Sequence, residues 1–154
     1  GGKAMDVISY EFSNDQLNRL TELLESFVKN VGVEVAVLCD DGGRLITFAP
    51  QLENLKTLSK RSAVVSAAIN GAVEYLEEFV DRGRTLYISG HTKSVYILKS
   101  EHSFILFCSF LNKTPLGSVK LFSERLMKEI SPILQSAKEK GKAERIIRFE
   151  DLAI

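Results

Sequence analysis

The sequence predicts an α+β domain built on one antiparallel sheet of five strands, with helices on both of its faces. Residues 33–39 (VEVAVLC) and 104–108 (FILFC) are almost continuously apolar, as expected of strands covered above and below. Three other stretches repeat apolar residues at the three- and four-residue spacing of amphipathic helices. The elements follow in the order helix, two strands, helix, three strands, helix, and this order favours one layered domain.

The first helix begins at Ser13. The Ser13 hydroxyl can accept a backbone hydrogen bond while the Gln16 side chain reaches back, which is the capping-box pattern, and Gly32 ends the helix. Residues 7–12 are compatible with a short strand or with a lead-in to the helix, so residues 1–12 form an N-terminal lead-in. The helix presents one apolar stripe, made of Leu17, Leu20, Leu24, Phe27, Val28 and Val31.

The first two strands form a hairpin that runs from Val33 to Phe48. Residues 40–43 (DDGG) connect the strands, because the glycines tolerate the backbone angles of a tight turn. Acidic residues before glycines are common turn formers, so we interpret Asp40 and Asp41 as turn residues and not as cation ligands.

The second helix is predicted over about residues 58–80, with Ser59 as its cap and residues 49–57 as the connector before it. Glycine inside a helix costs about 1 kcal/mol relative to alanine, so Gly71 requires an explanation. Either it allows close contact with the chain's own sheet, or it allows a helix of a second copy to approach. We expect one stripe to lie on the sheet, namely Val65, Ile69, Ala72, Leu76 and Phe79, and a second face to be formed by Val64, Ala68, Gly71 and Tyr75.

The three later strands are predicted at residues 84–89, 94–99 and 103–111. The first of them alternates, with Leu86 and Ile88 directed inward, which is the pattern of an edge strand with nothing obvious to block it.

The third helix is entered through Thr114 and Pro115, and Pro132 should kink or shorten it. Residues 13–137 therefore make up the domain. Residues 138–154 form a charged linker and an apolar tail that either folds back or binds a partner. The stripe of the third helix consists of Leu116, Val119, Leu126, Met127 and Ile130.

The composition limits the class of protein. The 20 basic and 20 acidic residues of the 154 cancel, which argues against nucleic acid or an anionic membrane as a partner. No apolar run approaches the roughly 20 residues of a bilayer span, and the start lacks the pattern of a signal peptide. Cys39 and Cys108 lie in apolar strands and are expected to be buried thiols. These observations predict a soluble, cytoplasmic protein.

The sequence shows no assembled catalytic or metal-binding motif. His91 and His102 lie in predicted turns without a metal-ligand spacing, and residues 90–94 (GHTKS) lead into a strand rather than a phosphate-binding helix. No serine lies in a GxSxG motif. We therefore expect no enzymatic activity, no metal and no cofactor.

Two segments resemble roadblock/dynein-light-chain domains. Gly32 and Val33, an apolar strand and residues 40–45 (DDGGRL) resemble the first hairpin of that family, and residues 112–121 (NKTPLGSVKL) resemble the entry into its last helix. The order of elements from about residue 15 to 134 also agrees. Roadblock domains are similar to profilin and longin folds, so the resemblance implies a five-stranded antiparallel sheet between one long helix and two others.

The resemblance also implies a function. Roadblock proteins typically dimerise through their second helices and third strands, lack activity of their own, and serve as platforms for Ras-like GTPases or motors. The members most similar in size are the MglB-type regulators, which modulate the nucleotide cycle of a Ras-like GTPase. The implied homodimer interface consists of Val64, Ala68, Gly71, Tyr75, Leu86, Tyr87 and Ile88.

The candidate contacts with the GTPase are Lys60, Arg61, Ala67 and Phe149. Arg61 is the residue to test as an arginine finger, and the tail from residue 146 to 154 is a candidate second docking segment. The alternative function is a small-molecule sensor, which needs a cavity near Tyr87, Tyr96 and Phe104.

Overall fold

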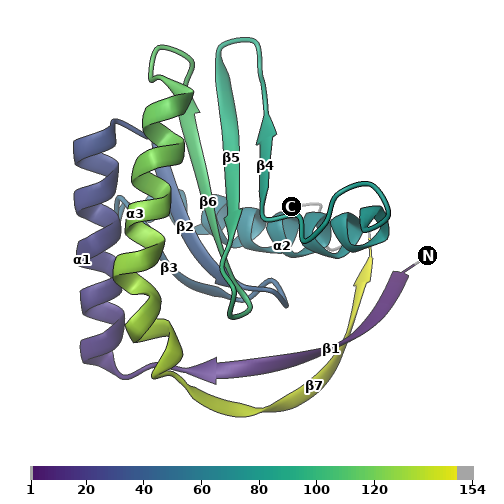
Figure 1. Ribbon diagram of the computed structural model, residues 1–154. Helices are drawn as coiled ribbons and strands as arrows, with labels where there is room; N and C mark the ends of the chain where they lie inside the picture. The colour runs from purple at the N-terminus through teal and green to yellow at the C-terminus, as the bar shows by residue number, and fades with distance from the viewer. Residues whose placement is uncertain (1, 149–154) are drawn as a thin grey trace.

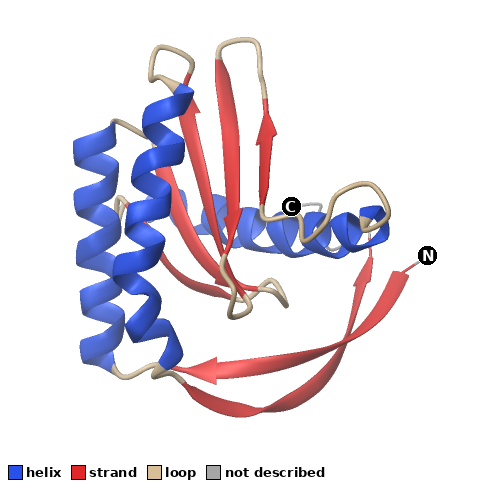
Figure 2. Ribbon diagram, viewed as in Figure 1, coloured by secondary structure: helices blue, strands red, loops and turns tan. Residues whose placement is uncertain are grey.

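The computed structural model describes the backbone of residues 2–148 and the side chains of residues 10–137. In this part of the chain, a five-stranded antiparallel sheet has the strand order β3-β2-β6-β5-β4. Helices α1 and α3 cover one face of the sheet and α2 covers the other (Figures 1 and 2). The predicted α+β fold is confirmed. The strands are β2 (Val35–Asp40), β3 (Leu45–Ala49), β4 (Thr85–Ile88), β5 (Lys93–Lys99) and β6 (Phe104–Leu111), and the helices are α1 (Asn14–Val31), α2 (Lys56–Val73) and α3 (Leu116–Gln135).

The start and end of α1 follow the predicted capping pattern. The backbone N–H of Gln16 donates to Ser13 Oγ at 3.1 Å, and the N–H of Ser13 donates to Gln16 Oε1 at 2.8 Å. Gly32 ends the helix in the left-handed conformation, with φ of 83°. These caps satisfy backbone groups that the helix itself leaves unpaired.

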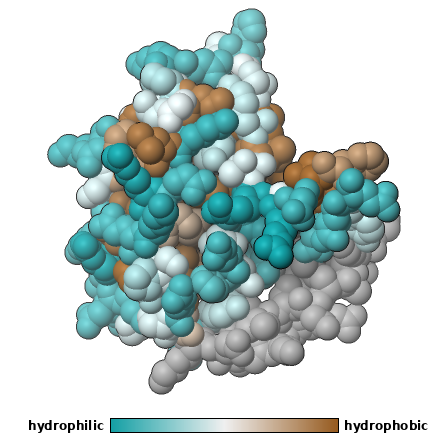
Figure 3. Space-filling model, in the orientation of Figure 1, coloured by the Kyte–Doolittle hydropathy of each residue, from teal (hydrophilic) through white to brown (hydrophobic). Residues whose placement is uncertain are grey.

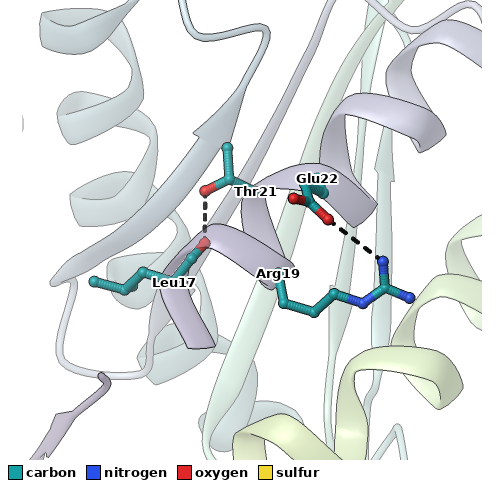
Figure 4. Close-up of polar contacts among 4 residues, drawn as sticks. All are labelled: Leu17, Arg19, Thr21 and Glu22. Atoms are coloured by element: carbon teal, nitrogen blue, oxygen red, sulfur yellow. Dashed lines mark hydrogen bonds and ion pairs between the residues drawn. The ribbon is translucent and has the colours of Figure 1, made fainter. Parts of the chain in front are cut away.

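One side of α1 is joined to β3 by a hydroxyl pair. Thr21 Oγ1 donates to the carbonyl of Leu17 at 2.8 Å and lies 2.5 Å from Thr47 Oγ1. On the solvent side, Arg19 and Glu22 form an exposed ion pair at 3.5 Å (Figure 4). An exposed pair of this kind contributes little to stability, so the buried face of the helix holds it on the sheet.

The two apolar strands lie at the centre of the sheet, as predicted. All six residues of β2 are buried, and β2 pairs with β6 from Val35 opposite Ser109 to Asp40 opposite Phe104. The larger core lies between the sheet and helices α1 and α3. It includes Leu20, Leu24, Leu38, Phe104, Leu106, Phe110, Val119 and Ile130.

Helix α2 lies on the sheet with a different face from the predicted one. It ends at Val73, before a single 3-10 turn, so the prediction of a helix to residue 80 was wrong. Of the predicted stripe, Ile69 packs against the apolar cluster beneath the helix, whereas Val65 is half-buried and Ala72, Leu76 and Phe79 are exposed. Small side chains on the sheet side allow the helix to lie close to the strands. The buried residues of α2 are Ser59, Ser62, Ala63, Ser66, Ala67 and Gly71.

Helix α3 continues through Pro132 and ends at Gln135. The proline therefore lies inside the C-terminal end of the helix and does not terminate it. Its buried residues include Val119, Leu126, Met127 and Ile130, four members of the predicted stripe.

The chain before α1 and after α3 forms a separate two-stranded ribbon. Strand β1 (Gly2–Glu11) pairs in antiparallel fashion with β7 (Lys138–Arg148). Residues 138–148 are therefore a strand, and their interpretation as a linker was wrong. Residues 149–154, including the predicted contact Phe149, lie outside the described part of the chain.

Among residues 2–148, no helix combines the length and apolar character needed to cross a bilayer.

Candidate interaction surface

Strand β4 forms one edge of the sheet. Within the described chain it pairs only with β5, from Thr85 opposite Leu98 to Ile88 opposite Val95, and its other side has no strand neighbour. Unpaired N–H and C=O groups on an edge are a template for another strand. The predicted edge strand is therefore confirmed, and its outer side is available for pairing.

Side chains of β4 divide between the two faces of the sheet. Leu86 packs with the apolar cluster beneath α2. Tyr87 lies on the α1–α3 side, where its ring stacks on Phe110 with a centroid separation of 6.5 Å. Tyr87 and Ile88 are 42% and 46% exposed. Hydrogen bonds to Ser89 and Ser94 lower the pKa of the Tyr87 hydroxyl.

The outward face of α2 is apolar as well. Val64, Val65 and Ala68 are half-buried, and Ala72 is exposed. A surface helix normally carries polar residues on its outer face, and a helix that is apolar all round is normally buried. This face therefore has the composition of a contact surface.

Gly71 has no close neighbour in the direction of its missing side chain. A Cβ atom built on Gly71 would meet no other atom within 4 Å. The chain's own sheet therefore does not require a glycine here. Gly71 is itself buried, but the space beside it does not force a glycine, and the approach of a second helix remains a prediction.

The segment after α2 extends the apolar surface. Its four large apolar residues are exposed: Tyr75 by 73%, Leu76 by 46%, Phe79 by 82% and Val80 by 47%. In Figure 3, hydrophobic (brown) atoms gather at this end of the molecule, beside β4 in the view. Clustered exposed apolar side chains mark interaction sites. We call Val64, Val65, Ala68, Gly71, Ala72, Tyr75, Phe79 and strand β4 the α2–β4 surface.

The two ends of α2 carry opposite charge. Lys56, Lys60 and Arg61 lie in its first turns, and no acidic residue lies within the helix. Glu74, Glu77, Glu78 and Asp81 follow its C-terminal end. Two such helices packed in antiparallel fashion place opposite charges against each other at both ends.

The predicted GTPase contacts differ in how exposed they are. Lys60 and Arg61 are exposed at the start of α2. Ala67 is fully buried against the sheet, because it belongs to the small-residue face of the helix. Ala67 is therefore not available to a docking partner.

Two of the three residues named for a small-molecule sensor lie in the packed core. Tyr96 and Phe104 are 2% and 1% exposed and belong to the packed core. Burial is the main cause of the raised pKa of Tyr96. A pocket of about 30 Å³ does lie between α2 and the sheet, beside Ser66 and Ile97. That volume holds about two water molecules. A wider, open hollow of about 560 Å³ lies beside α3 and is lined by residues that include Glu101, His102 and Gln135.

The acidic turn between β2 and β3 serves local structure. Asp40 Oδ1 accepts from the N–H groups of Gly42 and Arg44, at 3.0 and 2.9 Å. Across the described residues, no group of three or more His, Cys, Asp or Glu side chains could hold a metal ion. Cys39 and Cys108 are buried thiols, and burial raises the pKa of Cys108 to about 12.

Sequence reasoning missed the role of Asn112, which holds the hairpin tip next to the β4 edge. Its Nδ2 donates to the carbonyls of Gly90 and His91 at 3.0 and 3.3 Å, and its Oδ1 accepts from Ser94 Oγ at 2.6 Å. The sequence did contain one signal for this role, namely a polar residue directly after a strand that was predicted to be buried.

Known proteins resemble this chain in sequence and in structure. No protein-family model matches the chain. An uncharacterized protein of Aquifex aeolicus is 21% identical over 151 residues, which are 96% of this chain and 93% of that protein.

Three solved structures share the arrangement of helices and strands. Myxococcus xanthus MglB is 23% identical with a TM-score of 0.68, and the match covers 82% of this chain and 95% of that one. A structure described as MglB with tetrameric arrangement is 24% identical, with a TM-score of 0.66 and coverage of 82% and 96%. A Roadblock/LC7 domain from Streptomyces avermitilis is 14% identical, with a TM-score of 0.67 and coverage of 75% and 98%. The chain therefore has the roadblock fold of the MglB structures, as its hairpin and last-helix motifs predict.

Proposed function

We propose that this chain is a self-associating, non-enzymatic regulator or scaffold for a small Ras-like GTPase. The observation that carries the proposal is the α2–β4 surface, which combines an apolar helix face with an unpaired strand edge. In a roadblock fold, these are the two elements through which the family is expected to dimerise.

Three features support a second copy as the occupant of this surface. An antiparallel edge strand pairs naturally with its own copy about a twofold axis. Small residues at Ala68 and Gly71 let a second helix approach closely. The opposite charges at the two ends of α2 favour an antiparallel arrangement of the two helices.

The dimer then acts on its GTPase through differential binding. A regulator that binds one switch conformation more tightly shifts the GTPase toward that conformation without adding a catalytic group. Lys60 and Arg61 are exposed at the start of α2 in the single chain, and in the antiparallel pair they lie near the acidic segment of the second copy. These cations are the proposed GTPase contacts.

The test uses the Ras-like GTPase bound by an MglB-type regulator, loaded with GDP or with a non-hydrolysable GTP analogue. We expect this chain to bind one nucleotide state at least tenfold more tightly and to change the rate of hydrolysis or exchange. Arg61→Ala should weaken that effect, whereas Lys113→Ala, a control at an exposed lysine outside the α2–β4 surface, should not. Equal affinity for both states with unchanged rates contradicts the proposal.

A further inference from the structure

Strands β1 and β7 form a ribbon that is not part of the five-stranded sheet. In Figure 1 the ribbon leaves the base of α1 and α3 and runs below the sheet toward the opposite side of the molecule. Its root is anchored, because Tyr10 packs on Phe104 with ring centroids 4.8 Å apart. Beyond that root, its extensive contacts are those between its own two strands.

A two-stranded ribbon of this length is marginally stable in water without a third strand or a packed face. Both outer edges of the ribbon lack a strand neighbour within the described residues, so a further strand would stabilise the ribbon.

The two edges differ sharply in composition. Strand β7 (KEKGKAERIIR) has charged residues at seven of its eleven positions, and five of the seven are basic. Strand β1 (GKAMDVISYE) has charged residues at three of its ten positions and contains Val7, Ile8 and Tyr10, which favour strands. Charged residues, lysine above all, protect an edge from pairing. Strand β7 is therefore the protected edge and β1 the open one.

We propose that β1 pairs with the β1 strand of a second copy of this chain, forming a four-stranded sheet in the order β7-β1-β1-β7. Antiparallel pairing of a strand with its own copy is self-complementary, so the contact closes about a twofold axis. The pairing joins the two open edges to each other. It leaves only the two protected β7 edges facing solvent.

This contact is separate from the α2–β4 surface. One chain then carries two different self-complementary contacts, and together they build an assembly larger than a dimer. Each contact can be removed without the other, since the ribbon and α2 are different elements. The two proposals can therefore fail independently.

The experiment compares two lysine substitutions on the same rung of the ribbon, since Val7 lies opposite Ala143. Val7→Lys adds a protecting charge to the open edge, and Ala143→Lys adds the same charge to the edge that is already protected. The mass of each full-length variant is measured by light scattering over a range of protein concentrations. Thermal unfolding confirms that the domain is folded in both.

We expect the unchanged chain to exceed a dimer, Val7→Lys to form a dimer, and Ala143→Lys to match the unchanged chain. With Gly71→Arg, which blocks the α2–β4 surface, the chain should form a dimer through β1, and the double variant Val7→Lys, Gly71→Arg should be monomeric.

An unchanged mass in Val7→Lys, or an equal loss of mass in Val7→Lys and Ala143→Lys, overturns the β1 pairing. If Val7→Lys alone already produces a monomer, the β1 contact stands and the proposed α2–β4 contact fails.

Discussion

Gly90 occupies a position where no side chain fits. A Cβ atom there would lie 1.9 Å from the carbonyl oxygen of Lys93, which belongs to the backbone and cannot rotate away. The same turn is closed by the N–H of Gly90, which donates to Ser94 Oγ at 3.1 Å. The hairpin that ends the β4 edge therefore depends on glycine.

Gly90→Ala should lower the free energy of unfolding by about 1–3 kcal/mol, because the turn must open to admit the methyl group. The control is Gly117→Ala, where a Cβ meets no other atom within 4 Å. Its effect should stay within about 0.5 kcal/mol. Urea denaturation measures both values, and equal effects would show that the close approach at Gly90 is not the cause.

Asp41 gives the fold a defined pH dependence. Burial is the main cause of its raised pKa, and the neighbouring charge of Asp40 raises it further, while a hydrogen bond to Ser103 and the charge of Lys99 act in the opposite direction. In the unfolded chain the pKa of this carboxyl returns to about 3.9. Between these two pKa values, the folded state binds more protons than the unfolded state.

The free energy of unfolding that Asp41 contributes should therefore fall as the pH rises from about 3.9 through its folded pKa. Asp41→Asn removes this component while keeping the ability to bond Ser103. Denaturation at a series of pH values should show the difference between the two proteins changing within this window and constant well above it. A difference that does not vary with pH contradicts the assignment.

At the scale of elements, Asn112 joins three strands through one side chain. It follows β6, accepts from Ser94 in β5, and donates to the turn that ends β4. The position of the β4 edge thus depends on a residue outside that strand.

Asn112→Ala should lower the free energy of unfolding by about 0.5–1.5 kcal/mol, since its hydrogen bonds to two carbonyls and one hydroxyl are lost at an exposed site where water can replace them. Amide hydrogen exchange should locate the change, with faster exchange in residues 85–95 and unchanged exchange in β2. Uniformly faster exchange across the sheet would show instead that the loss is global.

The elements also show which parts of the structure a sequence can reveal. Strands β2 and β6 were predictable because burial on both faces leaves few polar positions in a strand. The orientation of α2 was not, because its buried residues are mostly serine and alanine while Val64 and Val65 are only half-buried. The pairing of β1 with β7 was hidden as well, since lysine-rich residues far along the chain read as a solvated linker.

The candidate surface was predictable to a similar degree. The weak alternation of residues 84–89 predicted an edge strand, and Gly71 predicted a helix face that a second helix could approach. The burial of Ala67 and the role of Asn112 depend on how α2 and the hairpin tip sit in three dimensions. One-dimensional spacing does not contain that information.

At the scale of the whole molecule, one sheet presents an open edge beside an apolar helix face, and a terminal ribbon presents a second open edge. A single copy leaves these surfaces in contact with water. We therefore propose that the assembled protein, and not the isolated chain, is the form that would engage a GTPase.

The solution mass of Gly71→Arg, compared with that of Gly117→Arg, tests the α2–β4 contact most directly. Both glycines lie in helices and have open space where a side chain would begin, but only Gly71 belongs to the α2–β4 surface. Measured in the Val7→Lys background, which removes the ribbon contact, Gly71→Arg should give a folded monomer and Gly117→Arg a dimer. A dimer in both variants would contradict the account.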